Sequence, residues 1–376
     1  MGMRLLAGGA LISALALAAW APIGTPKFDR SEPVLTWQSY SASPAGIHEW
    51  RSEKAPYTVE RLPDVSPDFR TGYAFVNHGK LVFFDLANKE QYRRVLGLFY
   101  MKEWIRTNRR RFYTRTTEFR FKRERPVVDA CSRAEEDACI GMKIQDDTFP
   151  YVYAESNGAV LTITNFGDAL LFKDNHWCRM EMTDDVYECR TENAPILQEP
   201  RKIQFYSSIV YRGRTLLGEW PTGRIYEFDG KTLRPSEMTP PAIAGAGRVG
   251  YEAQSMAMYC GDLFVGYWPK GEIYRLDGET NEWSLFAGLF EGVSNGDFVP
   301  FRTRVRGAGE KISPAFYGQR VTALVPYGDS LYATTSNLIS WTRDIKSSFL
   351  TDDQTKRYGA VYRIHRDGCR TTYRAD

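Results

Sequence analysis

The sequence predicts an all-β fold, a β-propeller of about six four-stranded antiparallel blades, with five to seven allowed. Residues 213–230 read GRTLLGEWPTGRIYEFDG and residues 261–278 read GDLFVGYWPKGEIYRLDG. The two copies are offset by 48 residues at every matched position, and that period is typical of a propeller blade. The segments between the shared glycines alternate as strands do, and aromatic residues, which favour sheets, make up 14% of the chain.

Glycines mark two turns in each of several blades. Those of the turn between the first and second strands are Gly158, Gly213, Gly261 and Gly328, and those before the third strand are Gly167, Gly223, Gly271 and Gly359. The third strands that follow are predicted at 169–172, 224–228, 272–276 and 360–364. An earlier segment, GKLVFFD at 79–85, is interpreted as a fifth third strand.

Residues 57–376 are predicted to be one propeller domain, with a degenerate blade in 100–150. The N-terminal segment 22–56 precedes it, and we hypothesise that residues within 33–60 add an outer strand that closes the ring. A closed ring leaves only short, protected strand edges.

The first 21 residues are predicted to be a secretory signal peptide. Arg4 precedes an apolar run from Leu5 to Ala21 that contains small residues suited to a cleavage site. The alternative is an uncleaved anchor, because the run has about the minimum length of a membrane span. Either way the sequence predicts export, with the domain secreted or periplasmic and no other membrane segment.

Six cysteines in an exported chain favour disulfides over metal thiolates. The spacing favours Cys131–Cys139 and Cys178–Cys189 as local pairs, which leaves Cys260–Cys369 as a long-range pair. Fifteen pairings remain formally open. No metal-ligand spacing occurs, so we expect neither a metal site nor a cofactor.

Composition excludes some function classes. The net charge of +3 is too balanced to indicate nucleic-acid binding. The chain has no phosphate-binding loop, dinucleotide-binding fingerprint or nucleophile elbow. We expect a monomer.

Propeller topology places the loops between second and third strands, and the connections between blades, on one face, here called the top face. Two insertions, at about 288–318 and 337–357, both fall there. Because binding residues concentrate on loops held by a rigid scaffold, the top face is the predicted functional face.

The top face offers an acid–base couple and a group of cations. In a closed ring His78 would approach Tyr358, and such a pair can transfer protons; the alternative is that His78 is a polar loop residue and Tyr358 packs against the insertion. The predicted substrate-binding cations are Lys270, Arg302, Arg304 and Arg306, with Arg320 at the start of a strand. Trp220 and Trp268 are predicted to stack on sugar rings or, alternatively, to pack between blades.

The passage SMAMYCGDLFVGYWPKGEIYRLDG at 255–278 resembles a repeat of exported bacterial β-propeller proteins, including sialidase-like and ulvan-lyase-like polysaccharide lyase propellers. The resemblance covers about 150–290 well and carries no catalytic residue. It implies an exported propeller and suggests a carbohydrate ligand. Together with the top-face cations, this predicts an anionic polysaccharide or oligosaccharide as partner.

Two functions remain open. The first is a polysaccharide lyase that cleaves uronate-containing chains by β-elimination. In that mechanism Arg320 or Arg304 neutralises the carboxylate. His78 and Tyr358 serve as base and acid, and Tyr317 is a second candidate acid. The second is a non-catalytic propeller that binds a glycan or a protein.

Overall fold

The computed structural model describes part of the chain. The described residues are 47–49, 55–65, 72–77, 80–85, 111–113, 117–122, 127–132, 139–143, 150–164, 167–174, 176–192, 203–244, 250–290, 318–337 and 357–372. They are almost entirely antiparallel β-sheet, with one short helix, α3 (Pro241–Ala244). None of the helices in these ranges is long and apolar enough to span a membrane.

Two blades are separate four-stranded sheets in chain order. The first consists of β5 (Arg111–Tyr113), β6 (Thr117–Lys122), β7 (Val127–Ser132) and β8 (Cys139–Lys143), so the region 100–150 does contain a blade. The second consists of β18 (Glu252–Tyr259), β19 (Asp262–Trp268), β20 (Glu272–Leu276) and β21 (Trp283–Gly288).

Two further blades share one nine-stranded sheet. One contains β9 (Pro150–Ser156), β10 (Ala159–Thr164), β11 (Ala169–Lys173), β12 (His176–Thr183) and β13 (Val186–Glu192). The other contains β14 (Gln204–Tyr211), β15 (Arg214–Trp220), β16 (Ile225–Phe228) and β17 (Leu233–Pro235). A single pair, Tyr187 with Leu233, joins β13 to β17.

The last blade takes a strand from the beginning of the chain. It contains β22 (Gln319–Tyr327), β23 (Ser330–Asn337) and β24 (Val361–His365), and its outer strand is β2 (Thr58–Arg61). β2 runs antiparallel to β24, with Thr58 opposite His365. A short sheet of β1 (Ile47–Glu49) and β25 (Arg370–Thr372) adds a second contact between the two ends of the chain.

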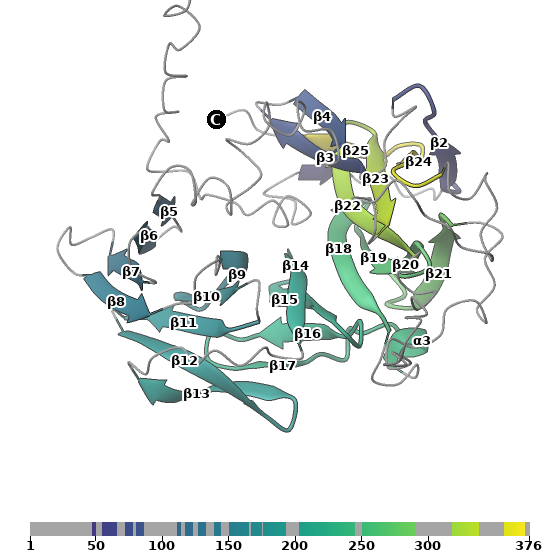
Figure 1. Cartoon of the computed structure of the whole chain (residues 1–376). Helices are drawn as coiled ribbons and strands as arrows, with labels where there is room; N and C mark the ends of the chain where they lie inside the picture. Colours follow the sequence, from purple (N-terminus) through teal and green to yellow (C-terminus); the bar gives the residue numbers. More distant parts are fainter. Residues whose placement is uncertain are drawn as a thin grey trace, which may run out of the picture.

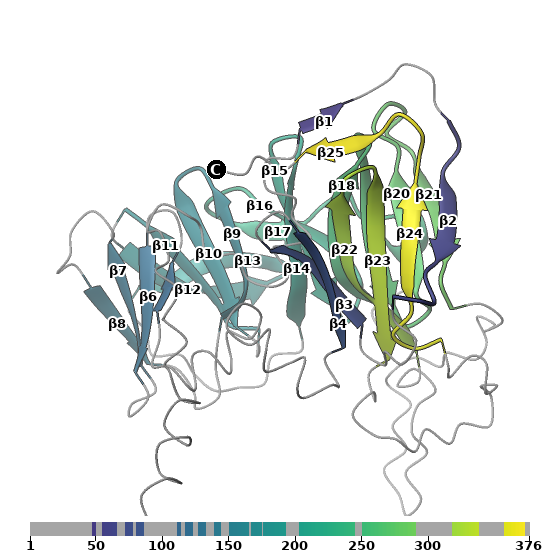
Figure 2. The same cartoon turned by 90° about the horizontal axis from the view of Figure 1, so that it is seen from above.

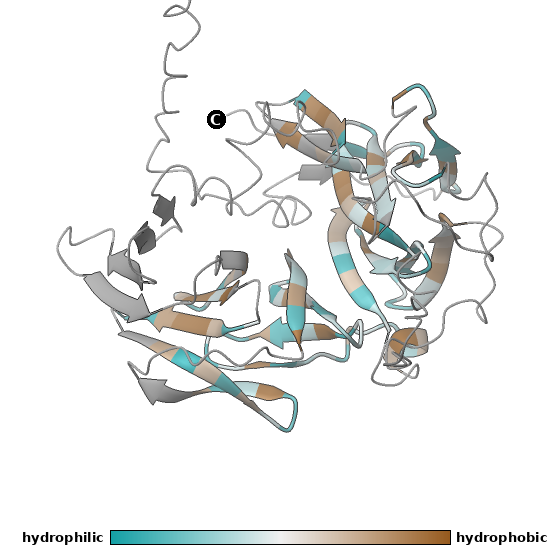
Figure 3. Cartoon of the chain, viewed as in Figure 1, coloured by the Kyte–Doolittle hydropathy of each residue, from teal (hydrophilic) through white to brown (hydrophobic). Residues whose placement is uncertain are grey.

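The sheets are arranged radially, as Figures 1 and 2 show. The first strands of successive blades, β9, β14, β18 and β22, lie on the inner side, and β12, β17, β21 and β2 lie further out. Apolar clusters fill the spaces between neighbouring blades, including one between β14–β16 and β18–β20 and one between β18–β20 and β22–β24. Figure 3 shows hydrophobic and hydrophilic residues along these strands. β18 and β19 are buried along nearly their whole length, as expected for strands of sheets that pack on both faces.

The glycines of the repeat let neighbouring blades approach closely. Gly218 of β15 faces the next blade, and an added Cβ would collide with the main chain of Ala253. An added Cβ at Gly266, 48 residues later, would collide with the side chain of Val321. The glycines that precede the third strands have another role, because all four have positive φ, which glycine adopts without strain.

Hydroxyl groups join the inner strands of successive blades. Ser207 Oγ donates to the carbonyl of Ala253 at 3.0 Å. Ser255 Oγ, at the equivalent position, donates to the carbonyl of Val321 at 2.7 Å. The repeated serine is therefore a contact between blades.

The Trp-Pro pairs also hold blades together, and both Trp–Pro peptide bonds are cis. The Pro221 carbonyl accepts hydrogen bonds from the main-chain N–H groups of Gly250 (2.9 Å) and Tyr251 (3.1 Å), where the next blade begins. The Pro269 carbonyl accepts one from Gln319 in the same way, at 2.6 Å. The repeated phrase is thus accounted for by blade packing.

The interpretation of 79–85 as a third strand was wrong. β3 (Gly72–Asn77) and β4 (Lys80–Asp85) form a hairpin in which β3 packs against the last blade. Gly72 lies against Gly359, and the Gly72 carbonyl accepts a hydrogen bond from Thr322 Oγ1. β3 is thus an inner, first strand, and β4 is the second strand of its hairpin.

Two of the predicted disulfides are present. Cys178–Cys189 joins β12 to β13, and Cys260–Cys369 joins the turn after β18 to the segment after β24. Cys131 and Cys139 are directly opposite each other in the β7–β8 register, and their pairing stays a prediction.

Candidate functional site

Each of the inner strands β9, β14, β18 and β22 has a shift in register close to its first residue. The register shifts within β9–β10, and again between Phe205 and Ser207 and between Ala253 and Ser255. A further shift occurs in β22, after Val321. A β-bulge re-aims side chains and is common beside functional sites. The bulges gather at the top end of the inner strands, and we call the surrounding residues Tyr73, Tyr206, Glu252, Gln254 and Arg320 the channel mouth.

A buried ion pair joins two blades at the channel mouth. Arg320 Nη2 lies 3.1 Å from Glu252 Oε2, and the Glu252 side chain is 1% exposed, whereas that of Arg320 is 19% exposed. Burial raises the pKa of the Glu252 carboxyl, and the Arg320 guanidinium opposes part of that rise. The two residues occupy equivalent positions in neighbouring blades. Glu252 comes directly before the residue at which the β18 bulge starts, and Arg320 comes directly before the corresponding residue of β22.

Two tyrosines lie beside this pair. Tyr206, on β14, donates a hydrogen bond to Gln204 Oε1 at 2.7 Å and is half-buried. Burial raises the pKa of Tyr206, and so does the negative charge of Glu252. Burial likewise raises the pKa of Tyr73, on β3, to about 12, with Arg320 and Glu252 as the next influences. Side chains from four blades therefore come together at the channel mouth.

Two buried oxygens at the channel mouth have no hydrogen-bond partner among the described residues. They are Oε1 of Glu252 and Oε1 of Gln254, on side chains of residues that are 1% and 2% exposed. Buried polar atoms are nearly always paired with protein, water or a ligand. The channel mouth thus presents two acceptors that a hydrogen-bond donor can satisfy.

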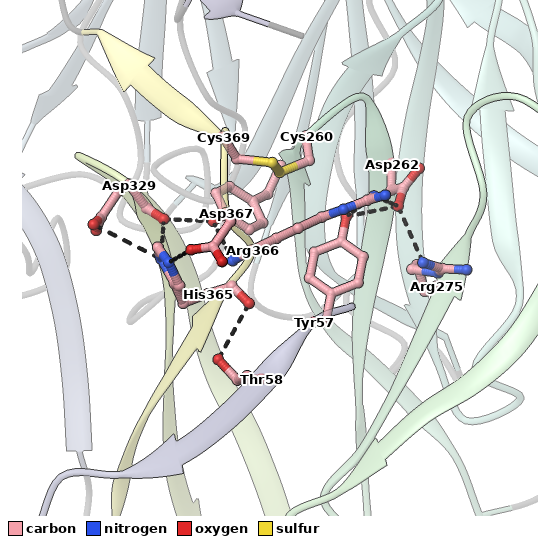
Figure 4. The surroundings of a disulfide bond; sticks show 11 residues. Tyr57, Thr58, Cys260, Asp262, Arg275, Asp329, His365, Arg366, Asp367 and Cys369 are labelled. Carbon is pink, nitrogen blue, oxygen red and sulfur yellow. Dashed lines mark hydrogen bonds and ion pairs between the residues drawn. A yellow bond between two sulfur atoms is a disulfide. The ribbon is translucent and has the colours of Figure 1, made fainter. Parts of the chain in front are cut away.

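A polar cluster at the opposite end of the blades has internal partners instead (Figure 4). Tyr57, just before β2, donates to Asp262 Oδ2 at 2.7 Å. Its ring lies beneath the guanidinium groups of Arg275 and Arg366, 5.3 and 4.8 Å from the ring centroid. Asp262 also forms an ion pair with Arg275 at 3.4 Å and accepts from the Gly278 N–H at 2.7 Å. This cluster, next to Cys260–Cys369, anchors the N-terminal segment.

The predicted acid–base couple gains no support from the flanking strands. His78 lies outside the described residues. The hairpin end formed by Asn77 and Lys80 is five residues along β3 from Gly72, about 17 Å at the usual rise of a strand. Tyr358 lies beside Gly359, which contacts Gly72 at the opposite end of β3 from Asn77. The Tyr358 residue is 4% exposed, and its ring centroid lies 5.3 Å from that of Phe290.

Some of the other predicted residues lie among the described residues and some do not. Lys270 donates to Tyr251 Oη at 3.0 Å and lies 3.9 Å from Glu272. Trp268 is fully buried, so its ring has no exposed face on which a sugar could stack, whereas Trp220 is half-buried opposite Gln204. The residues outside the described ranges are Arg302, Arg304, Arg306 and Tyr317.

The sequence reasoning identified Arg320 but overlooked the other residues of the channel mouth. The repeat contained a signal, because the same offset of 48 relates Tyr206 to Gln254 and Gln204 to Glu252. The residue types at these positions differ between blades. A search for residues that the repeats have in common therefore does not find them. Among the described residues, no group of three or more histidine, cysteine or acidic side chains is suited to a metal ion.

Comparison with known proteins finds only distant solved structures. No protein-family model matches the chain. No curated protein matches it either. The similar solved structures include streptogramin B lyase, with a TM-score of 0.27, 9% identity, and coverage of 86% of this chain and 98% of that one.

Two other solved structures are similarly distant. YCF48 bound to a D1 peptide has a TM-score of 0.26 and 8% identity, covering 84% of this chain and 98% of that chain. A protein of Bacteroides fragilis described as exported has a TM-score of 0.30 and 11% identity, with the same coverages. At these scores the likeness says nothing about activity, and the propeller rests on the radial sheets themselves.

Proposed function

We propose that the protein is an exported β-propeller that binds a carbohydrate at the channel mouth without transforming it. The observation that supports this most is the pair of unsatisfied buried oxygens on Glu252 and Gln254, beside the Glu252–Arg320 ion pair. A rigid scaffold whose buried acceptors have no partner among the residues that the structure describes has the form of a preorganised binding site.

Export is supported by the disulfides. Cys178–Cys189 and Cys260–Cys369 are bonds of a kind that persists in oxidising compartments. The N-terminal apolar run lies outside the described residues, and its role as signal peptide or anchor stays a prediction.

The contacts that Arg320 and Tyr358 make favour binding over β-elimination. Elimination needs a cation that can neutralise the uronate carboxylate, and Arg320 already neutralises Glu252. It needs a proton donor that reaches the leaving oxygen, and Tyr358 is packed against Phe290. The lyase reading stays a prediction that depends on residues outside the described ranges.

The test combines binding with a search for product. Purified protein is titrated calorimetrically with neutral and uronate-containing hexasaccharides, and the same mixtures are followed by absorbance near 232 nm. We expect heat of binding with at least one sugar and no rise in absorbance. A rise in absorbance would contradict the non-catalytic proposal and favour the lyase, and a complete absence of binding would contradict the carbohydrate proposal.

A further inference from the structure

We propose that the channel mouth selects an uncharged sugar, whose hydroxyl groups donate hydrogen bonds to Glu252 Oε1 and Gln254 Oε1. This inference rests on the proposed binding function and specifies its ligand. It differs from the anionic polysaccharide that the sequence suggested.

Two hydrogen-bond acceptors lie in the buried floor of the site. Glu252 and Gln254 lie two residues apart on β18, on either side of Ala253 at the start of the bulge. On these two residues, the buried atoms that lack a hydrogen-bond partner in the described part of the chain are both oxygens. A sugar hydroxyl can donate to either of them, whereas a carboxylate or sulfate can donate to neither.

The rim of the site is aromatic and cationic. Tyr206 is half-buried and the Arg320 side chain is 19% exposed, so solvent reaches both residues above the buried floor. Tyr206 has an apolar ring and a hydroxyl group, a combination that suits contact with a sugar. Trp220 is half-buried on the neighbouring strand, opposite Gln204. Such aromatic faces suit the apolar faces of sugar rings.

The charge of the site disfavours an anion. One guanidinium faces one carboxylate, so the Glu252–Arg320 pair has no net charge. A second carboxylate would have to share Arg320 with Glu252 in a largely buried setting, and an uncompensated buried charge is costly. A neutral ligand avoids this cost.

The experiment compares two classes of sugar on the full folded protein. Cellohexaose, maltohexaose and xylohexaose are the neutral probes, and hexagalacturonate and hexamannuronate are the acidic probes. Dissociation constants are measured by calorimetry at low and high salt. We expect a neutral sugar to bind with an affinity that salt hardly changes, because no charge is screened.

Two variants and a matched control locate the site. Tyr206→Phe is expected to weaken binding about fivefold, and Gln254→Met about tenfold, since each removes one hydrogen-bonding group. Tyr211→Phe is the control, because Tyr211 is at the opposite end of the same strand. It should leave affinity unchanged, and thermal melts verify that all three variants are folded.

Each outcome decides between the proposals. Neutral-sugar binding that both variants weaken supports the inference. Binding of acidic sugars alone, weakened by the same variants, overturns the neutral-ligand inference and leaves the binding function standing. Binding that ignores both variants, or no binding to any probe, overturns the proposed function at this site as well.

Discussion

Single residues at the blade interfaces decide how closely the sheets approach. Gly218 and Gly266 lie where an added Cβ would meet the next blade, on Ala253 and Val321 respectively. Packed interiors tolerate such an addition poorly. These glycines, which identified the repeat, therefore have a steric role that differs from that of the turn glycines.

Gly218→Ala is expected to lower the free energy of unfolding by about 2 kcal/mol, because the new methyl group must push two blades apart. Chemical denaturation measures this change. Gly288→Ala is the matched control, since Gly288 is also a strand glycine and its Cβ would meet no atom within 4 Å. Equal stability of the two variants would contradict the steric role.

Arg320 is expected to be needed for the stability of the fold, because the Glu252 carboxylate that it pairs with is buried. Arg320→Met should destabilise the fold by about 3 kcal/mol at pH 7, since the Glu252 carboxylate then lacks its counter-ion. The loss should shrink as the pH falls, because burial raises the pKa of the Glu252 carboxyl and the protonated group needs no counter-ion. The double variant with Glu252→Gln should recover much of the stability, and no recovery would mean that the pair does not act as a unit.

At the scale of elements, the turn between β15 and β16 is held by a buried carboxyl. Glu219, at the end of β15, accepts from the Thr222 N–H at 3.1 Å and from the Thr222 hydroxyl. Arg224, which follows the turn, is the nearby cation, and Tyr206, Tyr226 and Tyr267 surround the group. Burial raises the pKa of Glu219 to about 7.

Glu219 is expected to make stability depend on pH. Its folded pKa lies above the unfolded value of 4.5, so the folded state holds the proton more tightly. Its contribution is therefore fully present below pH 4.5 and is lost as the pH rises through 7, by about 3 kcal/mol. Denaturation at a series of pH values measures the slope. Glu219→Gln should flatten it, and an unchanged slope would assign the effect to another group.

At the scale of the whole molecule, contacts of residues 57–61 tie an N-terminal strand to the last blade. β2 completes the last blade, and Tyr57 is held between Arg275 and Arg366 beside the Cys260–Cys369 disulfide. Closure of this kind protects the outer edge of β24 from pairing with other chains.

The two disulfides are expected to differ in their effect on stability. Cys260–Cys369 spans 109 residues and Cys178–Cys189 spans 11, so loop entropy assigns them about 5 and about 3 kcal/mol. Paired Cys→Ser variants, followed by chemical denaturation, measure both values. A larger loss from the short loop would show that closure of the ring is not the main contribution of the long one.

The repeat allowed the propeller, most third strands and the turns to be predicted, because blade packing demands the same residues each time. The same method assigned 79–85 to the wrong strand of its blade. A glycine before an apolar strand occurs both in the turn before a second strand and in the turn before a third strand. The channel mouth was largely overlooked because Tyr206, Gln254 and Thr322 occupy equivalent bulges yet differ in chemistry. The proposed site consists of positions at which the blades differ.

A crystal structure of the protein with the tightest-binding neutral hexasaccharide tests the central claim most directly. The account predicts sugar density at the channel mouth, with hydroxyl groups within hydrogen-bond distance of Glu252 Oε1 and Gln254 Oε1 and a ring beside Tyr206. Sugar bound elsewhere, with water on both oxygens, would contradict it.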